Sequence, residues 1–146
     1  MLFYSQTKGH WTDGRGAIIV SGCISGNGPD MNKPASQFVH NHGPLPQGVY
    51  DMGPLLIPRD PLAPHLGPSM RLTPHAGNNM GNPARSGFFV HLTNPQHVDA
   101  SSDGCICPKN DRDIPGAAAP GLIEAQKIHV IKARRAAGET AVTVTA

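Results

Sequence analysis

The distribution of glycine and proline constrains the fold of this chain more than any other feature. The 146 residues include 17 glycines and 15 prolines. Both residue types interrupt helices and central strands, so they favour short strands joined by many turns. Residues 122–137 contain neither and are rich in helix formers, which predicts a helix there with Gly138 as its C-terminal cap. We therefore expect a mainly β fold, a curved sheet or sandwich with one late helix.

Apolar and β-branched segments between these breakers mark the expected strands. The expected strands cover 16–24, 48–52, 69–73, 87–91 and 140–145, with a weaker first strand within 1–8. Residues 53–68 hold five prolines and predict a surface excursion that forms a lid or rim. The length suits one hydrophobic core, so residues 1–146 are expected to form a single domain.

The charge pattern argues against several classes of partner. Twelve basic and ten acidic residues give a formal charge of +2, too little to indicate nucleic-acid binding. The basic group near the C-terminus fits the solvated side of the expected helix. Apolar runs are too short to cross a bilayer, and residues 1–8 lack the pattern of a secretory signal. We expect no nucleic-acid or membrane partner, and synthesis in the cytoplasm without a signal peptide.

Cys23, Cys105 and Cys107 are too few for a disulfide scaffold. An odd count is compatible with one reactive thiol and a bridge between the other two, and the spacing leaves that bridge open.

The middle of the chain carries the most chemistry. The segment Arg85-Ser-Gly-Phe-Phe-Val-His91 is followed by ten residues and then by Ser102-Asp-Gly-Cys105. An apolar run that ends in histidine predicts a strand delivering an imidazole to the edge of a site. A thiol and an imidazole brought together form the minimal apparatus of nucleophilic acyl transfer.

Each residue of this pattern has an expected role. Cys105 is the candidate nucleophile and His91 its general base, provided that an acceptor such as the carbonyl just after His91 holds the other ring nitrogen. The Cys105 N–H and neighbouring backbone donors would meet the developing oxyanion, with Gly104 permitting close approach. Ser102 is expected to hydrogen-bond within the turn and fix the loop.

These residues resemble the L,D-transpeptidase catalytic domain, whose signature is a histidine followed by Ser/Thr-His-Gly-Cys. They are most similar to the subset found among type VI secretion effectors that attack peptidoglycan. Gly43-Pro-Leu-Pro-Gln-Gly-Val-Tyr50, Met70-Arg-Leu-Thr-Pro74 and the segment ending at His91 also resemble motifs of that subset, in the same order. Two positions differ from the family pattern: Leu92 stands in place of the usual glycine, and Asp103 in place of a second histidine.

The resemblance implies a curved catalytic domain of the L,D-transpeptidase type and a substrate, the stem peptide of peptidoglycan. It implies an L,D-carboxypeptidase or D-amino-acid exchange reaction without cofactor or metal. In this reaction Arg85 and Ser86 are candidates to bind the substrate, although a structural role for Arg85 is an equal alternative. It further implies an antibacterial toxin acting in a target cell's periplasm, with an immunity protein and a secretion-machine component as partners.

The sequence leaves three alternatives open. Cys105 and Cys107 could be ordinary buried thiols on a strand. A zinc site could draw on these cysteines and on some of the histidines at 40, 42, 91 and 97, although the usual Cys-x-x-Cys spacing is missing. The whole domain could bind peptidoglycan, or cap a secretion or phage structure, without turnover.

Overall fold

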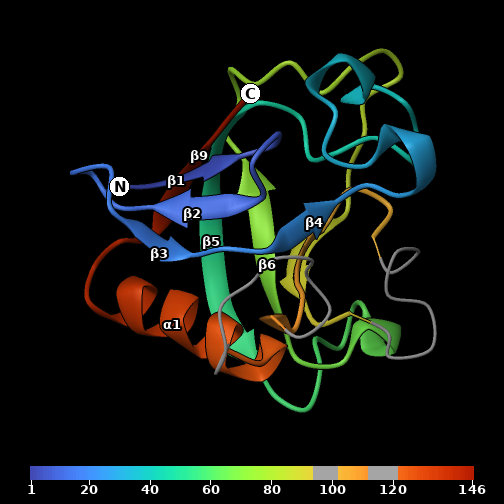
Figure 1. Ribbon diagram of the computed structural model, residues 1–146. Coiled ribbons are helices and arrows are strands. Elements are labelled where there is room, and N and C mark those ends of the chain that lie inside the picture. The colour runs from blue at the N-terminus through green and yellow to red at the C-terminus, as the bar shows by residue number, and fades with distance from the viewer. Residues whose placement is uncertain (94–101, 112–121) are drawn as a thin grey trace.

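The computed structural model describes residues 1–93, 102–111 and 122–146, and Figure 1 shows the chain as a ribbon. The described part is mainly β, with one α-helix late in the chain, α1 (Glu124–Ala136). The strands are β1 (Leu2–Ser5), β2 (His10–Thr12), β3 (Ile18–Val20), β4 (Cys23–Ser25), β5 (Gly48–Leu56), β6 (Ser69–Pro74), β7 (Phe88–His91), β8 (Ile106–Pro108) and β9 (Ala141–Thr145). Short 3-10 helices are η1 (Gly28–Asp30), η2 (Pro34–Ser36) and η3 (Pro64–Leu66).

All of these strands belong to one mixed sheet of nine strands in the order β3-β2-β1-β9-β5-β6-β7-β8-β4. The pairs β1–β9 and β7–β8 are parallel, and the other neighbours are antiparallel. The two edge strands, β3 and β4, follow one another directly in the chain. The sheet therefore curls until its edges nearly meet.

The expected single strand over 16–24 is wrong, because the chain divides it between the two edges of the sheet. Gly22 has φ of +69°, a left-handed conformation that breaks the extended chain. At this seam Cys23 N donates to Gly9 O at 2.8 Å. A Cβ on Gly9 would lie 2.2 Å from Cys23 O, so the close approach of the two backbones requires glycine there. The short strand β2 was also absent from the sequence prediction, and β8 was foreseen only by the alternative that puts Cys105 and Cys107 on a strand.

The inner face of the curled sheet holds the main core. Its largest side chains include Tyr4, Trp11, Tyr50 and Met70, all fully buried. Figure 1 shows α1 lying across the end toward which β5 points, and the helix adds Ile128 and Ile131 to this core. Burial of each such side chain contributes roughly 1.5 to 3 kcal/mol, so the inner cluster dominates the stability of the domain.

The helix and last strand confirm two sequence predictions with small shifts at their ends. The helix begins at Glu124 rather than 122 and ends at Ala136, and β9 begins at Ala141. Gly138 has φ of +107°, as expected of a C-terminal capping glycine. At the other end the Gln126 side chain accepts a hydrogen bond from Ile123 N at 3.0 Å. Within the described ranges, no helix has the length and apolar character that a membrane crossing requires.

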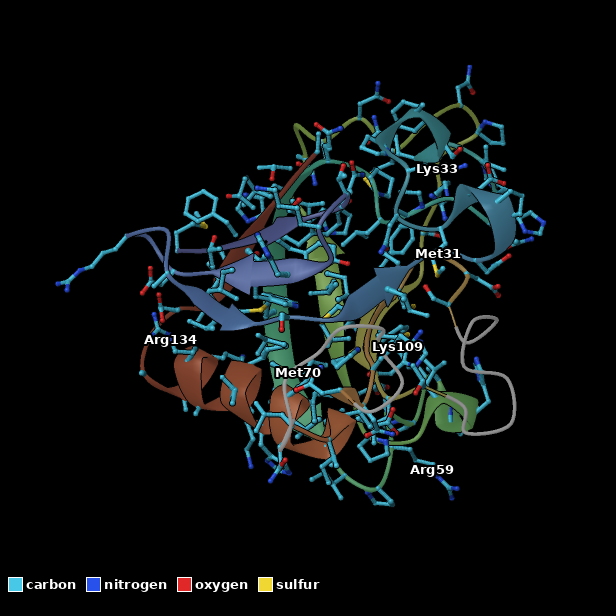
Figure 2. The ribbon with its side chains drawn as sticks, viewed as in Figure 1. Met31, Lys33, Arg59, Met70, Lys109 and Arg134 are labelled. Atoms are coloured by element: carbon cyan, nitrogen blue, oxygen red, sulfur yellow. The ribbon has the colours of Figure 1, made fainter. Side chains whose placement is uncertain are left out.

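A smaller cluster lies on the outer face of the sheet. It consists of Ile24, Ala63, Phe89, Cys105 and Cys107, with Met31 and Leu66 packed against it. Figure 2 separates the two regions, with Met70 between the strands and α1 and Met31 beside β4.

Because successive residues of a strand point to opposite faces of the sheet, Cys23 and Cys107 do not form the disulfide that the sequence left open. In the β4–β8 ladder, Ile24 is paired with Cys107 and Cys23 with Pro108. Cys23 therefore belongs to the inner cluster and Cys107 to the outer one, so the two thiols point away from each other. All three cysteines are free.

The proline-rich excursion is shorter than expected. Strand β5 continues to Leu56 through a register shift between Met52 and Leu55, which accommodates Pro54. The remaining loop is tied to β6 by Asp60, whose carboxylate accepts two hydrogen bonds from Arg71 at 2.8 and 3.0 Å. This pair holds the loop against the outer face, where Ala63 is buried.

Candidate active site

The ladder between β7 and β8 brings the predicted pair of side chains to one face. Val90 is paired with Ile106, and both point into the main core. His91 and Cys105 therefore project to the outer face, offset by two positions along neighbouring strands. Both line one cavity of about 360 Å³. Its other lining residues are Leu62, Ala63, His65, Leu66, Gly87, Phe89 and Asp103, so the proline-rich loop forms one wall, consistent with the predicted rim.

His91 is held in an orientation suited to a general base. It is buried, and its Nδ1 lies 2.8 Å from Leu92 O, the carbonyl directly after it, which is one of the acceptors that the sequence analysis considered. A carbonyl can only accept, so Nδ1 carries the proton and Nε2 the lone pair. Burial lowers the pKa of His91, which keeps the ring neutral near pH 7.

Cys107 is the thiol in direct contact with His91. The acyl-transfer prediction did not use it, and only the zinc alternative grouped it with the histidines. Its Sγ lies 3.3 Å from Nε2 and 3.6 Å from Nδ1. A group in line with the Nε2 lone pair at that distance would be roughly 5 Å from Nδ1, so this sulfur lies beside the ring rather than in line with the lone pair. The Cys-x-Cys spacing was the available signal, because alternate residues of a strand share a face.

The lone pair of Nε2 is therefore directed elsewhere. Among the described residues, no hydrogen bond to Nε2 other than the Cys107 contact is present, and none joins His91 to the Cys105 thiol. The cavity that both residues line is the space in which a substrate would meet them.

Cys105 is a buried thiol at rest. Its Sγ accepts a hydrogen bond from Phe89 N at 3.3 Å, and its side chain is nearly covered. Desolvation raises the pKa of Cys105 to about 11, although the Phe89 amide and the Arg85 cation act in the opposite direction. A thiol with this pKa beside a neutral imidazole stays protonated, so the two groups form a neutral pair rather than an ion pair.

Ser102 fixes the turn before Cys105, as predicted. Its buried hydroxyl donates to Cys105 O at 2.5 Å and accepts from Gly104 N at 3.1 Å and from Gly26 N at 2.9 Å. The Gly104 amide is therefore occupied, and the Cys105 amide is the better candidate for an oxyanion donor. The turn is also tied to β4, because Ser25 Oγ donates to Gly104 O at 2.8 Å.

Arg85 has partners other than the substrate carboxylate expected of it. Its guanidinium is buried and donates to four backbone carbonyls at 2.5 to 3.0 Å, those of Gln37, Gly43, Pro44 and Asp103. Gly104 makes room for it, since a Cβ there would lie 2.5 Å from the Arg85 Nη2 atom. These contacts support the structural alternative, in which Arg85 joins three loops around the site.

A second cavity of about 330 Å³ lies on the other side of Cys105. Cys105, Gly87 and Asp103 line both cavities, and Ser86 lines only the second. Asp103 Oδ1 accepts a hydrogen bond from Asn27 Nδ2 at 3.3 Å, which holds the carboxylate at the boundary of the two spaces. Ser86 is exposed and free to contact a ligand there. The thiol is thus reached from two sides.

The zinc alternative finds no support in the described residues. None of their His, Cys, Asp and Glu side chains form a group of three or more that could hold a metal ion. His40 Nε2 is 3.0 Å from Pro83 O, and His42 Nδ1 is 2.8 Å from Asn27 Oδ1. His97 lies outside the described residues.

Comparisons with known proteins give no relative: no family model, no curated protein and no solved structure matches this chain. What the site can do chemically therefore follows from its own residues. They define a mainly β domain whose outer face carries a thiol and a neutral imidazole on one cavity.

Proposed function

We propose that this protein performs cysteine-dependent acyl transfer on peptidoglycan stem peptides, as an L,D-carboxypeptidase, a D-amino-acid exchange enzyme or both. The observation that carries the proposal is the cavity shared by Cys105 and His91, two residues far apart in sequence. The segments that resemble the L,D-transpeptidase effectors supply the substrate class. The order and spacing of those segments link this cavity to that reaction.

The proposed reaction begins with transfer of the Cys105 thiol proton to Nε2 of His91 while sulfur attacks the carbonyl carbon. The carbonyl oxygen becomes an oxyanion that the Cys105 N–H stabilises. Collapse breaks the C–N bond, and His91 returns the proton to the leaving amine of the terminal D-amino acid. The resulting thioester is then cleaved by water, giving a shortened stem, or by the amine of another D-amino acid or stem, giving exchange or cross-linking.

The electrostatics of the resting site favour a general-base mechanism over a preformed thiolate. The pKa of Cys105 is raised and that of His91 is lowered, both chiefly through burial. Charge separation between them is therefore unfavourable until a carbonyl is present to accept the sulfur. The neutral pair protects the thiol from unrelated electrophiles in the absence of substrate.

The resemblance extends the proposal to biology. We place the protein among antibacterial effectors delivered by a type VI secretion system, made in the cytoplasm and active in the periplasm of a target cell, where stem peptides are found. An immunity protein and a component of the secretion machine are the partners implied.

A second candidate function is a binding module without turnover, on peptidoglycan or in a secretion or phage structure. The absence of a hydrogen bond between Cys105 and His91 among the described contacts favours it, as do Leu92 and Asp103, which differ from the family pattern. Only the enzyme would convert its substrate, so a test of turnover separates the two functions.

The deciding experiment incubates the protein with purified tetrapeptide muropeptides and follows the products by mass spectrometry. The expected product is the tripeptide, or an exchanged species when a free D-amino acid is added. Cys105→Ala and His91→Gln should abolish it. Cys23→Ala is the matched control, because that thiol is buried on the opposite face of the sheet. An inert wild type that still binds cell wall would overturn the enzyme proposal in favour of the binding module.

A further inference from the structure

The first residue of α1 reaches back to the segment that follows His91. The Glu124 carboxylate accepts hydrogen bonds from Thr93 Oγ1 and, at 3.3 Å, from Thr93 N. Thr93 is buried, and the two residues are 31 positions apart in the chain. Glu124 is itself fixed, because its backbone N–H donates to Asn110 Oδ1 at 2.9 Å. The backbone that carries this carboxylate is therefore held at the start of the helix.

The group that Glu124 holds is the same peptide unit that holds the imidazole. Thr93 N–H and Leu92 C=O belong to one planar peptide group and point in opposite directions. Glu124 accepts from the N–H, and His91 Nδ1–H donates to the C=O at 2.8 Å. Fixing one end of the plane fixes the other, and a negative charge at the N–H end makes the carbonyl a stronger acceptor.

We propose that Glu124 is a positioning residue for His91: through the Leu92–Thr93 peptide it holds the imidazole in the tautomer that leaves Nε2 free to accept a proton. Its consequence for catalysis rests on the proposed function. The carboxylate thus acts on the imidazole as the acid of a Ser-His-Asp triad does, but through one intervening peptide group. A bulky residue at 92, in place of the glycine found in the similar family, makes an external support for this peptide useful.

A purely structural role for Glu124 is the competing explanation. An acidic residue in the first turn of a helix interacts favourably with the helix dipole. That role would leave the titration and tautomer of His91 unchanged when Glu124 is altered. The charged or titratable groups that share the space around His91 are Cys107 from β8, Cys105 and Asp103 from the preceding turn and His65 from η3. None of these changes in the variants below.

The test measures His91 directly by nitrogen-detected NMR of the histidine side chains across pH. His91→Gln assigns the resonance among the eight histidines. Wild type should show a single Nδ1–H tautomer. Glu124→Ala should give a mixture of tautomers and a lower titration midpoint, because the imidazolium loses the support of a polarised carbonyl. Glu124→Gln, whose amide oxygen can still accept, should lie between them.

Two further variants complete the design. Thr93→Val keeps the backbone N–H and removes only the hydroxyl, so it should produce a smaller change of the same sign. Glu139→Gln makes the same chemical change at the chain's only other glutamate, which pairs with Arg134 away from the site, and should leave His91 unaltered. If Glu124→Ala fails to fold, Glu124→Gln and Thr93→Val decide the outcome.

Activity supplies the second readout. On muropeptides, Glu124→Ala should lower kcat by about 10- to 100-fold with little change in KM. Unchanged tautomer and titration of His91 in all Glu124 and Thr93 variants would overturn the proposal, whatever the activity. A wild type without activity would instead sink the proposed function, while the NMR result would still decide the role of Glu124.

Discussion

The two hydrophobic clusters of this domain lie on opposite faces of one sheet and have different compositions. The inner cluster is built from large aliphatic and aromatic side chains, among them Trp11, Tyr50 and Ile131, and α1 closes it. The outer cluster is small, and two of its members are the thiols Cys105 and Cys107. The difference shows how a short chain separates its tasks: the inner face stabilises the fold, so the outer face can keep a thiol and an imidazole beside a cavity.

The two faces are also held together by different interactions. Apolar contact dominates the inner face. The outer face depends on charged side chains that bind backbone or loops, namely Arg85 on its four carbonyls and Arg71 on Asp60. Directional bonds of this kind fix the position of a loop more closely than apolar packing does. A site built on the outer face therefore keeps its shape with a minimal core of its own.

The sharpest test of this contrast removes the same atoms from each face. Ile131→Ala in the inner cluster should lower the free energy of unfolding by about 4 kcal/mol, because the enclosed cavity cannot collapse. Ile24→Ala in the outer cluster should cost roughly 2 kcal/mol, since its neighbours border open space and can relax. Urea denaturation measures both. Equal losses would mean that the outer cluster contributes to stability as the inner one does.

Breaking a buried ion pair beside the β3–β4 seam should lower the free energy of unfolding by nearly as much as truncating Ile131 in the inner core. Lys127 is 1 % exposed in its side chain, and its Nζ is 2.6 Å from Asp111 Oδ1. Asp111→Asn leaves this ammonium buried and still bonded to the Ser21 carbonyl but without its carboxylate, and should cost about 3 kcal/mol.

The same pair gives a pH test. The Lys127 hydrogen bond, with help from the Leu122 amide, lowers the pKa of Asp111 below its usual value. A lowered carboxyl pKa gives stability that is complete above the ordinary carboxyl range and is lost as pH falls through the lowered pKa. Thermal melts between pH 7 and 2 should show this loss in wild type. The part due to Asp111 should be missing from Asp111→Asn.

A smaller effect is expected where the outer face depends on a guanidinium. Arg85→Lys puts a single ammonium where the guanidinium binds four carbonyls. It should reduce the free energy of unfolding by about 2 kcal/mol and lower turnover, because the Cys105 turn loosens. Arg134→Lys is the matched control on a partly exposed ion pair, with an expected change of at most about 1 kcal/mol. If both variants behave alike in denaturant melts, Arg85 does not organise the outer face.

The smallest effect concerns the reactivity of the outer thiol. Because burial raises the pKa of Cys105 to about 11, its alkylation by iodoacetamide should keep rising through pH 9 without a plateau near neutrality. Peptide mapping by mass spectrometry separates its modification from that of Cys23 and Cys107. A plateau below pH 7 would instead reveal a preformed thiolate–imidazolium pair and contradict the neutral resting state.

Much of the local structure was predictable from sequence, and the reasons are local too. The helix is preceded by Pro120-Gly121 and followed by Gly138 in the sequence. The strands ending at His91 and beginning at Ser69 show the apolar pattern of buried strands. The role of Ser102 followed from the turn in which it stands. The Leu92 carbonyl lies within reach of His91 because the two residues are adjacent.

What the sequence could not reveal depends on pairing between distant segments. The split of 16–24 into two edge strands becomes visible only when the sheet closes. The contact of Cys107 with His91, the four carbonyls around Arg85 and the reach of Glu124 to Thr93 each join residues at least 16 positions apart. No periodicity encodes such neighbours. They follow from the register of the ladders.

The seam between β3 and β4 connects the Cys105 turn to the edge of the sheet. Strand β4 completes the sheet against β8, and its last residue, Ser25, holds the Gly104 carbonyl, while Gly26 holds Ser102. The turn that carries Cys105 is therefore assembled only once β4 has paired with β8. A partly folded chain in which β4 has not yet paired with β8 would lack the hydrogen bonds that organise the turn around Cys105.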